Sequence, residues 1–487
     1  MSKGITIIGL GPNDHRLWTL AAAEILTQSP EIYARTAHHP SLTHLSATVH
    51  GFDDLLAQTN SLEAAGEQLA AQIVRLGRRA EGVVYAVPGH PVIDDVTVPF
   101  IQRLAQTSEL PVTVIPGLSL LETAQDLLSV QGQAGWQIVS AAEIAGLHHP
   151  PLAPDRPGLV TRLYSQNLAA AVKQTLGNAY ADEFEIILLD PIDGSQQPCP
   201  LSRLDKQTNF NLQTMLYLPA DPANASFVTF QETIAHLRAP DGCPWDREQT
   251  HQSLRPFLLE EAYEVLEALD TGDTAGLAEE MGDLLLQIVL HTQIAIDTGE
   301  FNMGHVIDHI NRKLLRRHPH VFGDVEVNSV DDVTTNWETI KKAEKAARGQ
   351  TDQIPSALDG VPQALPALTQ ALTISKRAVK MGFEWPNIEG VLDQLIEEAH
   401  EITMAESPEH LEAEIGDLLF SAVNLARWRK IDPESALRGT NARYRWRFQK
   451  MEQLAAAQGK NLPDLSTDDM EILWNEAKAY ERQTENG

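Results

Sequence analysis

The chain has 487 residues, which at an average of about 150 residues per domain predicts roughly three domains. Apolar residues make up 43% of the chain and charged residues 21%, so the chain can bury hydrophobic cores and is not disordered as a whole. The formal net charge of −30 repels nucleic-acid backbones and anionic membrane surfaces at long range, which argues against nucleic-acid polymers and membranes as partners.

The two cysteines, Cys199 and Cys243, are too few for a disulfide framework or a zinc site built from cysteines, and they favour a reducing environment. The N-terminal apolar run is broken by Gly9, Gly11 and Pro12, so it resembles neither a secretory signal nor a membrane span. No other stretch is long and apolar enough to cross a bilayer. We therefore expect a cytoplasmic protein.

The first part of the chain, from residue 5 to about residue 218, alternates short β-branched runs with longer segments of helical periodicity such as LWTLAAAEIL. This alternation predicts an α/β domain. Most of the runs end in Gly or Pro, which places irregular backbone at the carboxyl ends of the strands, where open α/β sheets usually bind ligands. The runs are ITIIGLG, GVVYAVPG, VTVIPG, EIILLD and TMLYLP.

Three loops that follow predicted strands carry the candidate cofactor-binding residues. The first loop holds Gly9 and Gly11, the second (VPGHP) holds Pro88 and Gly89, and the third (PGLS) holds Ser119. Glycine lets a ligand approach the backbone closely, although a simple strand-to-helix turn explains Gly9 and Gly11 equally well.

Together with Asp14, these loops resemble the tetrapyrrole methylase family over residues 4 to about 218. The resemblance implies a cleft between two α/β subdomains that binds S-adenosylmethionine, and it does not identify the methyl acceptor. The residues that it assigns to this cofactor are Gly9, Gly11, Pro88, Gly89 and Ser119.

Beyond DPANAS, residues 221–226, the chain changes to long segments rich in Leu, Ala and Glu with helical periodicity, which indicates a domain boundary. The stretch at residues 350–368 carries several prolines and a glycine and is typical of a linker. We therefore predict an α/β domain followed by two all-α modules. Their expected bounds are 1–222, 223–350 and 351–487.

An internal repeat relates the two helical modules. Glu261 recurs in the second copy as Glu398, whereas Glu280 recurs as Glu414 at an offset that is shorter by three positions. The difference predicts a connection that is three residues shorter in the second copy. A third set recurs at a constant and still shorter offset: Asn311, Lys313 and Arg317 pair with Asn441, Arg443 and Arg447.

Each module places pairs of carboxylates three residues apart, which puts both members on one face of a helix. Antiparallel packing of the two acidic helices would gather four carboxylates around one point, and such a group needs a hard cation, Mg²⁺ or Mn²⁺. A solvated helix face is the ordinary alternative, but the same pattern occurs twice in register. The candidate metal ligands are Glu261, Glu264, Glu280 and Asp283, and in the second copy Glu398, Glu401, Glu414 and Asp417.

Basic residues lie at helical spacing in INRKLLRRHPHVFGD and TNARYRWRFQKME. Guanidinium groups are preferred partners of phosphate oxygens, so beside a metal cluster they describe a polyphosphate site, whereas alone they describe a solvated basic face. Aromatic residues could stack on a nucleotide base, although aromatic residues at this spacing are more often core. The candidates are Trp337, Trp385, Tyr444 and Trp446.

The chain from Phe230 to about Lys478 resembles the MazG nucleoside triphosphate pyrophosphohydrolases, whose signature is EExxE followed by ExxD. The resemblance implies an all-α fold that dimerises, Mg²⁺ held by the second and third Glu of EExxE with the Glu and Asp of ExxD, and hydrolysis of a nucleoside triphosphate to the monophosphate and pyrophosphate. The segments that carry it include LRAPDGCPWDREQTHQSL, EEAYE, EEMGD, RRHPHVFGD, WETIKKAEK, KRAVKMGFEWP, EEAHE, AEIGDLLFSAVNLARW and NARYRWRF.

In tandem members of this family the second copy is usually the competent one, which implies catalysis by Glu398, Glu401, Arg443 and Arg447. The second copy departs from the family at two positions. Trp446 stands where Arg is common, and His410 stands where a Lys often precedes the ExxD helix. At these two positions the resemblance implies no phosphate contact in the second copy.

Two other functions compete with a pyrophosphohydrolase that is a homodimer and acts on nucleoside triphosphates. In the first, methyl transfer from S-adenosylmethionine is the main activity and the helical half is a dimerising or regulatory module. In the second, the chain is a binding module whose acidic clusters are remnants. The identity of the products formed from nucleoside triphosphates distinguishes them.

Overall fold

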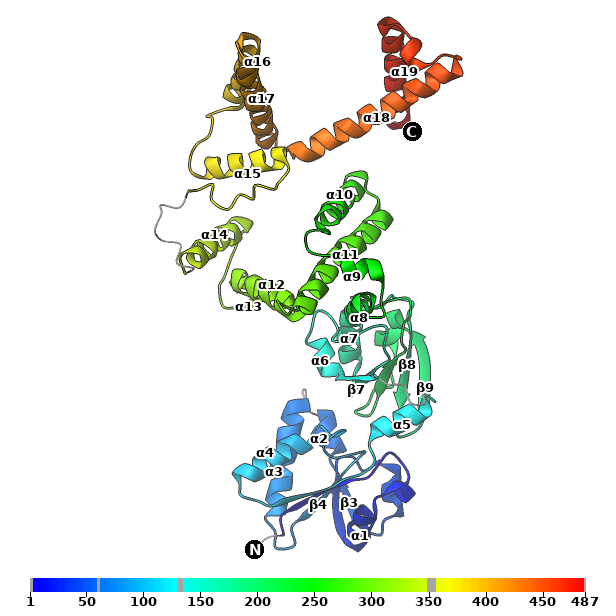
Figure 1. The fold of residues 1–487 in the computed structure, drawn as a ribbon. Coiled ribbons are helices and arrows are strands. Elements are labelled where there is room, and N and C mark those ends of the chain that lie inside the picture. Colours follow the sequence, from blue (N-terminus) through cyan, green and yellow to red (C-terminus); the bar gives the residue numbers. More distant parts are fainter. Residues whose placement is uncertain (1–2, 59–61, 130–134, 348–355, 486–487) are drawn as a thin grey trace. The chain divides into compact units, whose positions relative to one another are not determined.

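The computed structural model describes residues 3–58, 62–129, 135–347 and 356–485. The chain forms two compact units, Met1–Asp241 and Gly242–Gly487. The first is α/β and the second is helical, which confirms the predicted fold class (Figure 1). Within the described part of the chain, no helix is both long and apolar enough to cross a membrane.

The first half of the α/β unit is built on a five-stranded parallel sheet in the order β3-β2-β4-β1-β5. Ile5 and Ile7 of β1 pack with α3 and α4, whereas Ile8 packs with α1, so helices cover both faces. The elements are β1 (Ile5–Gly9), α1 (Leu20–Gln28), β2 (Glu31–Ala34), β3 (Thr48–Gly51), α2 (Asp53–Gln58), α3 (Leu62–Gly77), β4 (Val83–Val87), α4 (Val98–Thr107), β5 (Val112–Ile115) and α5 (Leu120–Leu127).

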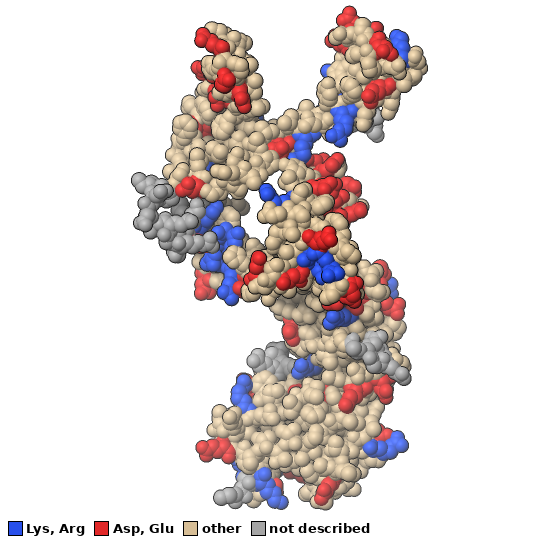
Figure 2. Space-filling model, in the orientation of Figure 1, with Lys and Arg blue, Asp and Glu red and all other residues tan. Residues whose placement is uncertain are grey.

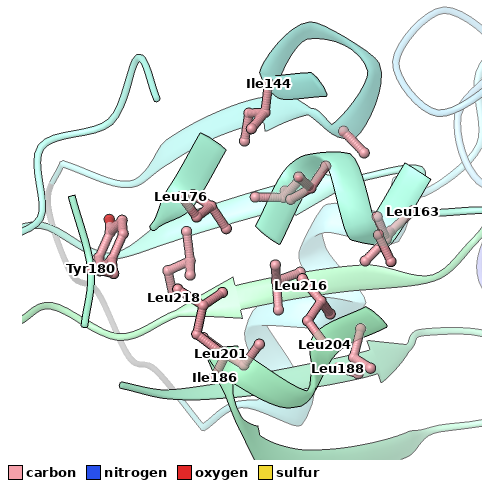
Figure 3. Packing of buried hydrophobic residues seen from close by; sticks show 14 of the residues in the cluster. Ile144, Leu163, Leu176, Tyr180, Ile186, Leu188, Leu201, Leu204, Leu216 and Leu218 are labelled. Atoms are coloured by element: carbon pink, nitrogen blue, oxygen red, sulfur yellow. The ribbon is translucent and has the colours of Figure 1, made fainter. Parts of the chain in front are cut away.

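The second half of this unit has a mixed sheet in the order β6-β7-β10-β8-β9, in which β6 and β7 are parallel and the remaining pairs are antiparallel. Its core joins Leu216 and Leu218 to side chains of α6 and α7, which point toward one another in Figure 3. The elements are β6 (Gln137–Ser140), α6 (Ala141–Ala145), β7 (Gly158–Thr161), α7 (Gln166–Leu176), β8 (Glu185–Asp190), β9 (Ser195–Pro200) and β10 (Met215–Leu218).

Helix α8 (Phe227–Arg238) belongs to the first compact unit. Its N-cap Ser226 donates through Oγ to Asp155 Oδ2 at 2.9 Å, which ties the start of the helix to the α/β unit. The compact unit therefore extends beyond residue 222. The predicted boundary at 350/351 lies outside the described residues, and the division into three domains remains a proposal.

The second unit consists of helices, and the repeat appears in it as two antiparallel hairpins, α10 with α11 and α16 with α17. The elements are α9 (Pro244–Glu248), α10 (Arg255–Thr271), α11 (Thr274–Thr298), α12 (Met303–Arg317), α13 (Pro319–Phe322), α14 (Val330–Ala347), α15 (Ala367–Lys380), α16 (Ile388–Met404), α17 (Pro408–Trp428), α18 (Pro433–Ala457) and α19 (Thr467–Glu485).

The shorter offset of the second copy is absorbed in a helix and not in a loop. Helix α10 continues to Thr271, where Gly272 adopts a left-handed conformation (φ 70°) and ends it, whereas α16 stops at Met404. Measured from the last glutamate of EExxE, α16 is thus about one turn shorter than α10. The prediction of a shortened connection is corrected to a shortened helix end.

Replacing Leu216 by Ala will destabilise the α/β unit by about 3 kcal/mol, because the side chain is fully buried in a close-packed cluster and its loss leaves a cavity. Urea unfolding followed by circular dichroism measures the change. Leu20→Ala is the matched control, since that side chain is 91% exposed and should change stability by less than about 0.5 kcal/mol. Equal effects of the two substitutions would contradict the assigned core.

Candidate functional sites

The first acidic group lies on the hairpin of α10 and α11. Glu261 and Glu264 share one face of α10, and Glu280 faces them from α11, with a carboxylate oxygen of each within 4.8 Å of the others. The fourth predicted ligand, Asp283, lies outside this group, although its charge contributes to raising the pKa of Glu261. The structure therefore brings three of the four predicted ligands together.

Burial and mutual repulsion both act on this first group. Partial burial raises the pKa of Glu261, and the neighbouring Glu264 raises it further because a proton shared between the two carboxylates relieves their repulsion. Burial and then the charge of Glu264 likewise raise the pKa of Glu280. Among the described residues, none of the three forms an ion pair with Lys or Arg. The group thus lacks a positive charge at its centre.

The second acidic group repeats this arrangement on α16 and α17 with Glu398, Glu401 and Glu414. Glu398 is only 8% exposed and accepts a hydrogen bond from Gln394 Nε2 at 2.7 Å. His410 Nε2 lies 2.8 Å from Glu414 Oε1, one turn away on the same helix. As in the first copy, the aspartate of ExxD, here Asp417, lies outside the group of three.

Both groups fit a hard divalent cation. They offer only carboxylate oxygens, which Mg²⁺, Mn²⁺ and Ca²⁺ prefer, and no sulfur ligand that would favour a softer metal. Three convergent carboxylates leave room for waters or phosphate oxygens as further ligands. Figure 2 shows acidic side chains gathered over α16 and α17 and over α10. The geometry thus brings the three predicted glutamates of each module together, without the predicted aspartate.

The arginines expected to contact phosphate have other partners in the structure. Arg317 of α12 donates through Nη2 to Glu344 Oε2 of α14 at 2.6 Å, and its guanidinium lies 5.2 Å from the ring centroid of Trp337. Hydrogen bonds from Arg317 and Arg316 lower the pKa of Glu344 to about 2. This pair therefore connects α12 to α14 in the first module.

The second module repeats this connection. Arg447 of α18 donates to Glu481 of α19 with an Nη2–Oε2 distance of 2.5 Å, and its guanidinium lies 5.7 Å from the ring centroid of Trp474. Arg443 donates to Thr440 Oγ1 at 3.0 Å. Within the described part, neither arginine forms an ion pair or hydrogen bond with the second acidic group. Their contact with phosphate remains a prediction.

No ring contact joins the aromatic candidates to one another in the described part of the chain. Trp337 lies beneath Arg317, Tyr444 lies 5.0 Å from Trp474 between ring centroids, and Trp446 is exposed. Trp385 donates through its backbone N to Glu384 Oε1.

Sequence reasoning missed Trp474, although the repeat contained the signal. Trp474 follows Trp337 at the same offset at which Glu398 follows Glu261. Glu481 follows Glu344 at this offset as well, so the tryptophan and its neighbouring glutamate recur together.

The glycine loops of the α/β unit meet at the carboxyl ends of β1, β4 and β5. Gly11 and Gly89 exchange backbone hydrogen bonds, with Gly89 N donating to Gly11 O at 2.8 Å. A Cβ on Gly9 would lie 2.6 Å from both Gly117 N and Gly89 O. Glycine is thus required at residue 9 by the packing of loop on loop, whether or not a ligand approaches it.

Asp94, which sequence reasoning missed, joins the second loop to the third. Its Oδ2 accepts hydrogen bonds from His90 N at 2.7 Å and Leu120 N at 3.0 Å, and its Oδ1 accepts one from the hydroxyl of Ser119. Burial raises the pKa of this carboxyl. Ser119 also caps α5, so its position is fixed from two sides. No motif distinguished Asp94 from the acidic residues beside it.

A cleft of about 790 Å³ lies between the two halves of the α/β unit. Pro88 lines it, as do residues that follow β2 and residues from the second half such as Tyr164 and Phe210. The cleft confirms that the unit has a concave site near the ends of parallel strands, where α/β sheets usually bind ligands.

Two family models match this chain. The MazG nucleotide pyrophosphohydrolase domain matches residues 249–322 and again residues 387–451. The tetrapyrrole (corrin/porphyrin) methylase model matches residues 4–184. The two MazG matches contain both acidic groups, and the methylase match contains all three glycine loops.

Several curated proteins are similar in sequence. The uncharacterized protein YabN of Bacillus subtilis is 39% identical over 99% of this chain and 100% of its own length. The nucleoside triphosphate pyrophosphohydrolase/pyrophosphatase MazG of Thermotoga maritima is 43% identical over 52% of this chain and 96% of its own length. The nucleoside triphosphate pyrophosphohydrolase of Escherichia coli is 41% identical over 51% of this chain and 95% of its own length.

Replacing Glu280 by Gln will raise the melting temperature without divalent cations, because it removes one charge from a group of mutually repelling carboxylates. A cation that binds only the folded state stabilises it, so about 10 mM Mg²⁺ should raise the melting temperature of the unaltered chain. This rise should be smaller in the Glu280→Gln variant. Differential scanning calorimetry measures both effects.

Glu300→Gln is the control for net charge, because Glu300 lies two residues beyond the end of α11 and outside the acidic group. It should leave the response to Mg²⁺ unchanged. An unaltered response in the Glu280→Gln variant would mean that the first acidic group holds no cation.

Proposed function

Because this chain belongs to the MazG nucleotide pyrophosphohydrolase family and carries a tetrapyrrole methylase domain ahead of two MazG modules, we propose that it hydrolyses nucleoside triphosphates to monophosphates and pyrophosphate with the help of Mg²⁺ or Mn²⁺. The observation that carries this proposal is the recurrence, in both modules, of three convergent carboxylates without a Lys or Arg counter-ion in the described chain.

The acidic groups would hold the divalent cation and, through it, the substrate. A triphosphate carries several negative charges, so the carboxylates alone would repel it. When bound, the cation neutralises this charge and polarises the phosphorus under attack. In the second module Glu398, Glu401 and Glu414 would be its ligands.

The remaining chemistry falls to side chains that position water and stabilise charge. A carboxylate oxygen of the acidic group would orient the attacking water and accept its proton. The water oxygen forms a bond to the α-phosphorus, and the bond from the α-phosphorus to the oxygen that bridges it to the β-phosphorus breaks, so negative charge develops on the pyrophosphate that leaves. Arg443 is a candidate to stabilise this charge, because its one hydrogen bond in the described part, to Thr440, leaves the rest of its guanidinium free.

We infer that the second module is the working copy. Glu398 is buried and fixed by Gln394, whereas the equivalent Glu261 is more exposed and has no such donor, because Phe257 occupies the position equivalent to Gln394. A ligand whose own orientation is fixed holds a metal more firmly than a mobile one does.

Exposed apolar side chains support the homodimer. Three pairs of equivalent positions on the two acidic hairpins are both apolar and exposed, which a monomer in water would not favour. Helical hairpins that bury such faces against a second copy form bundles. The equivalent pairs are Leu259 with Ile396, Met281 with Ile415, and Leu285 with Leu419.

We propose in addition that the α/β unit binds S-adenosylmethionine beside the loops that hold Gly9, Gly11, Pro88, Gly89 and Ser119. Two observations support this proposal. The loops meet at the ends of three parallel strands, next to the cleft, and the methylase model matches residues 4–184. Methyl transfer is therefore the second candidate activity, and the acceptor is unassigned.

Replacing Glu398 by Gln should lower Mg²⁺-dependent hydrolysis by about 100-fold or more, because the substitution removes one anionic ligand from a group of three. To measure this, the unaltered chain and the variant are each incubated with Mg²⁺ and one nucleoside triphosphate at a time, and the products are resolved by ion-exchange chromatography. We expect the monophosphate and pyrophosphate.

Glu261→Gln is the matched control in the first module and should retain most of the activity. Loss of hydrolysis in this variant but not in Glu398→Gln would reverse the assignment of the working copy. Diphosphate and inorganic phosphate as primary products would exclude cleavage between the α- and β-phosphates.

Replacing Gly89 by Val should abolish binding of S-adenosylmethionine to the full chain. Gly89 has φ +69°, and a Cβ there would lie 2.4 Å from Asp94 Oδ2, so the substitution forces two loops apart. Calorimetric titration measures binding. Gly272→Val, also at a positive φ but in the helical unit with open space around it, should leave binding unchanged. If titration of the unaltered chain with S-adenosylmethionine releases or absorbs no heat, the proposal that the α/β unit binds this cofactor is wrong.

A further inference from the structure

Arg35 is a buried arginine at the side of the 790 Å³ cleft. It directly follows β2, and its backbone N donates to Ala86 O of the neighbouring strand at 2.9 Å. The side chain is only 2% exposed, yet it lines the cleft. Arginine is seldom buried this deeply without a binding partner for its guanidinium.

One partner lies behind the guanidinium. Asp95, whose side chain is fully buried, places Oδ2 at 3.2 Å from Arg35 Nε. The other oxygen of Asp95 accepts hydrogen bonds from Thr97 N, Thr97 Oγ1 and Val98 N at the start of α4, so the carboxylate cannot turn further toward Arg35. The aspartate therefore neutralises the charge while it engages only the Nε edge.

The Nη groups of Arg35 have no hydrogen-bond partner in the described part of the chain, and Nε itself makes none with hydrogen-bond geometry. Leaving the buried Nε of a cation unsatisfied destabilises the folded state, because this donor loses its water without gaining an acceptor. An oxyanion with two oxygens matches the fork of a guanidinium and would satisfy these donors. The unpaired donors thus point to an anionic ligand group in the cleft.

The rest of the cleft opposes further negative charge. Arg35 is the single Arg among the described lining residues, and none of them is Lys. Three aspartates, Asp53, Asp190 and Asp193, also line the cleft. A ligand with many carboxylates would face these aspartates with one guanidinium to balance it.

His39 adds no positive charge at neutral pH. Burial lowers its pKa to about 4, and its Nε2 lies 3.1 Å from Gly11 O. Because a carbonyl only accepts hydrogen bonds, Nε2 carries the proton, and Nδ1 accepts from the hydroxyl of Ser41 at 2.8 Å. His39 therefore connects the wall of the cleft to the first glycine loop as a neutral ring.

We propose that this cleft binds a small molecule with a single oxyanion group, a carboxylate or a phosphate, which pairs with the Nη groups of Arg35, and that it excludes polycarboxylates. Tyr164 and Phe210 on the other side of the cleft provide an apolar surface for the body of the ligand. This assignment concerns the α/β unit alone and depends neither on hydrolysis of nucleotides nor on binding of S-adenosylmethionine.

The test is calorimetric titration of the full chain with four probes: benzoate, phenyl phosphate, the uncharged benzamide and the octacarboxylate uroporphyrin. We expect benzoate or phenyl phosphate to bind at least about tenfold more tightly than benzamide, and uroporphyrin to show no binding that depends on Arg35. Tighter binding of benzoate would indicate that the cleft recognises a carboxylate, and tighter binding of phenyl phosphate that it recognises a phosphate.

Two variants locate the binding. Asp95→Asn leaves Arg35 without its counter-ion and should tighten binding of the oxyanion about tenfold. The double variant Arg35→Met with Asp95→Asn removes both buried charges and should lose the preference for benzoate over benzamide. Arg103→Met is the control, because this arginine is exposed on α4.

The proposal is overturned if the unaltered chain shows no preference for either oxyanion over benzamide, or if the double variant keeps that preference. It is equally overturned if Asp95→Asn does not bind more tightly, or if uroporphyrin binds through Arg35 more tightly than benzoate. Circular dichroism establishes that each variant is folded. If a variant fails to fold, the comparison of benzoate with benzamide on the unaltered chain still decides the matter.

Discussion

Repulsion among carboxylates held within 4.8 Å of one another governs the helical half of this protein. A spacing of three residues places two glutamates on one helix face, and the hairpin brings the third from the next helix. Without a Lys or Arg partner in the described chain, this arrangement weakens the folded state, and burial adds to the cost by raising the pKa of Glu261, Glu280 and Glu401. Such clusters persist where function requires them, because a bound cation offsets the repulsion. Packing elsewhere in the hairpins must therefore hold the glutamates in place.

The two modules share one repeated sequence pattern, but the side chains around their carboxylates differ. In the second copy Glu398 is buried and accepts a hydrogen bond from Gln394, and Glu414 has His410 beside it. The equivalent positions of the first copy hold Phe257 and Gly276, which offer no such side-chain contacts. What the copies share is the connection from Arg317 to Glu344 and from Arg447 to Glu481, each with a tryptophan beneath the guanidinium. The repeated ion pair fixes the frame of each module, whereas the surroundings of the carboxylates have diverged.

The α/β unit depends on close approach of backbone to backbone. Gly9, Gly89 and Gly117 pack so tightly that a methyl group on any of them would meet main-chain or Asp94 atoms at 2.6 Å or less. Asp94 and Ser119 then tie the loops together with side-chain hydrogen bonds. Pro88 of the second loop lines a cleft whose wall contains Arg35, and His39 of that wall bonds to Gly11 of the first loop, so one rigid junction connects the glycine loops to the side of the cleft that holds the buried guanidinium. Rigidity of this kind reduces the entropy lost when a ligand binds.

The sequence by itself determined the α/β and all-α classes, the strands that end in glycine loops, and the repeat that pairs Glu261 with Glu398 and Glu280 with Glu414. These features follow from local periodicity and from offsets along the chain, which need no knowledge of packing. Only the tertiary structure decided that Asp283 and Asp417 lie outside the groups of three, that Arg317 and Arg447 pair with glutamates of a later helix, and that Asp94 and Arg35 matter at all. Each of these contacts depends on the direction of a side chain and on which elements pack together. Direction and packing are set by the burial of whole helix and sheet faces, a property of the folded chain that no short segment contains.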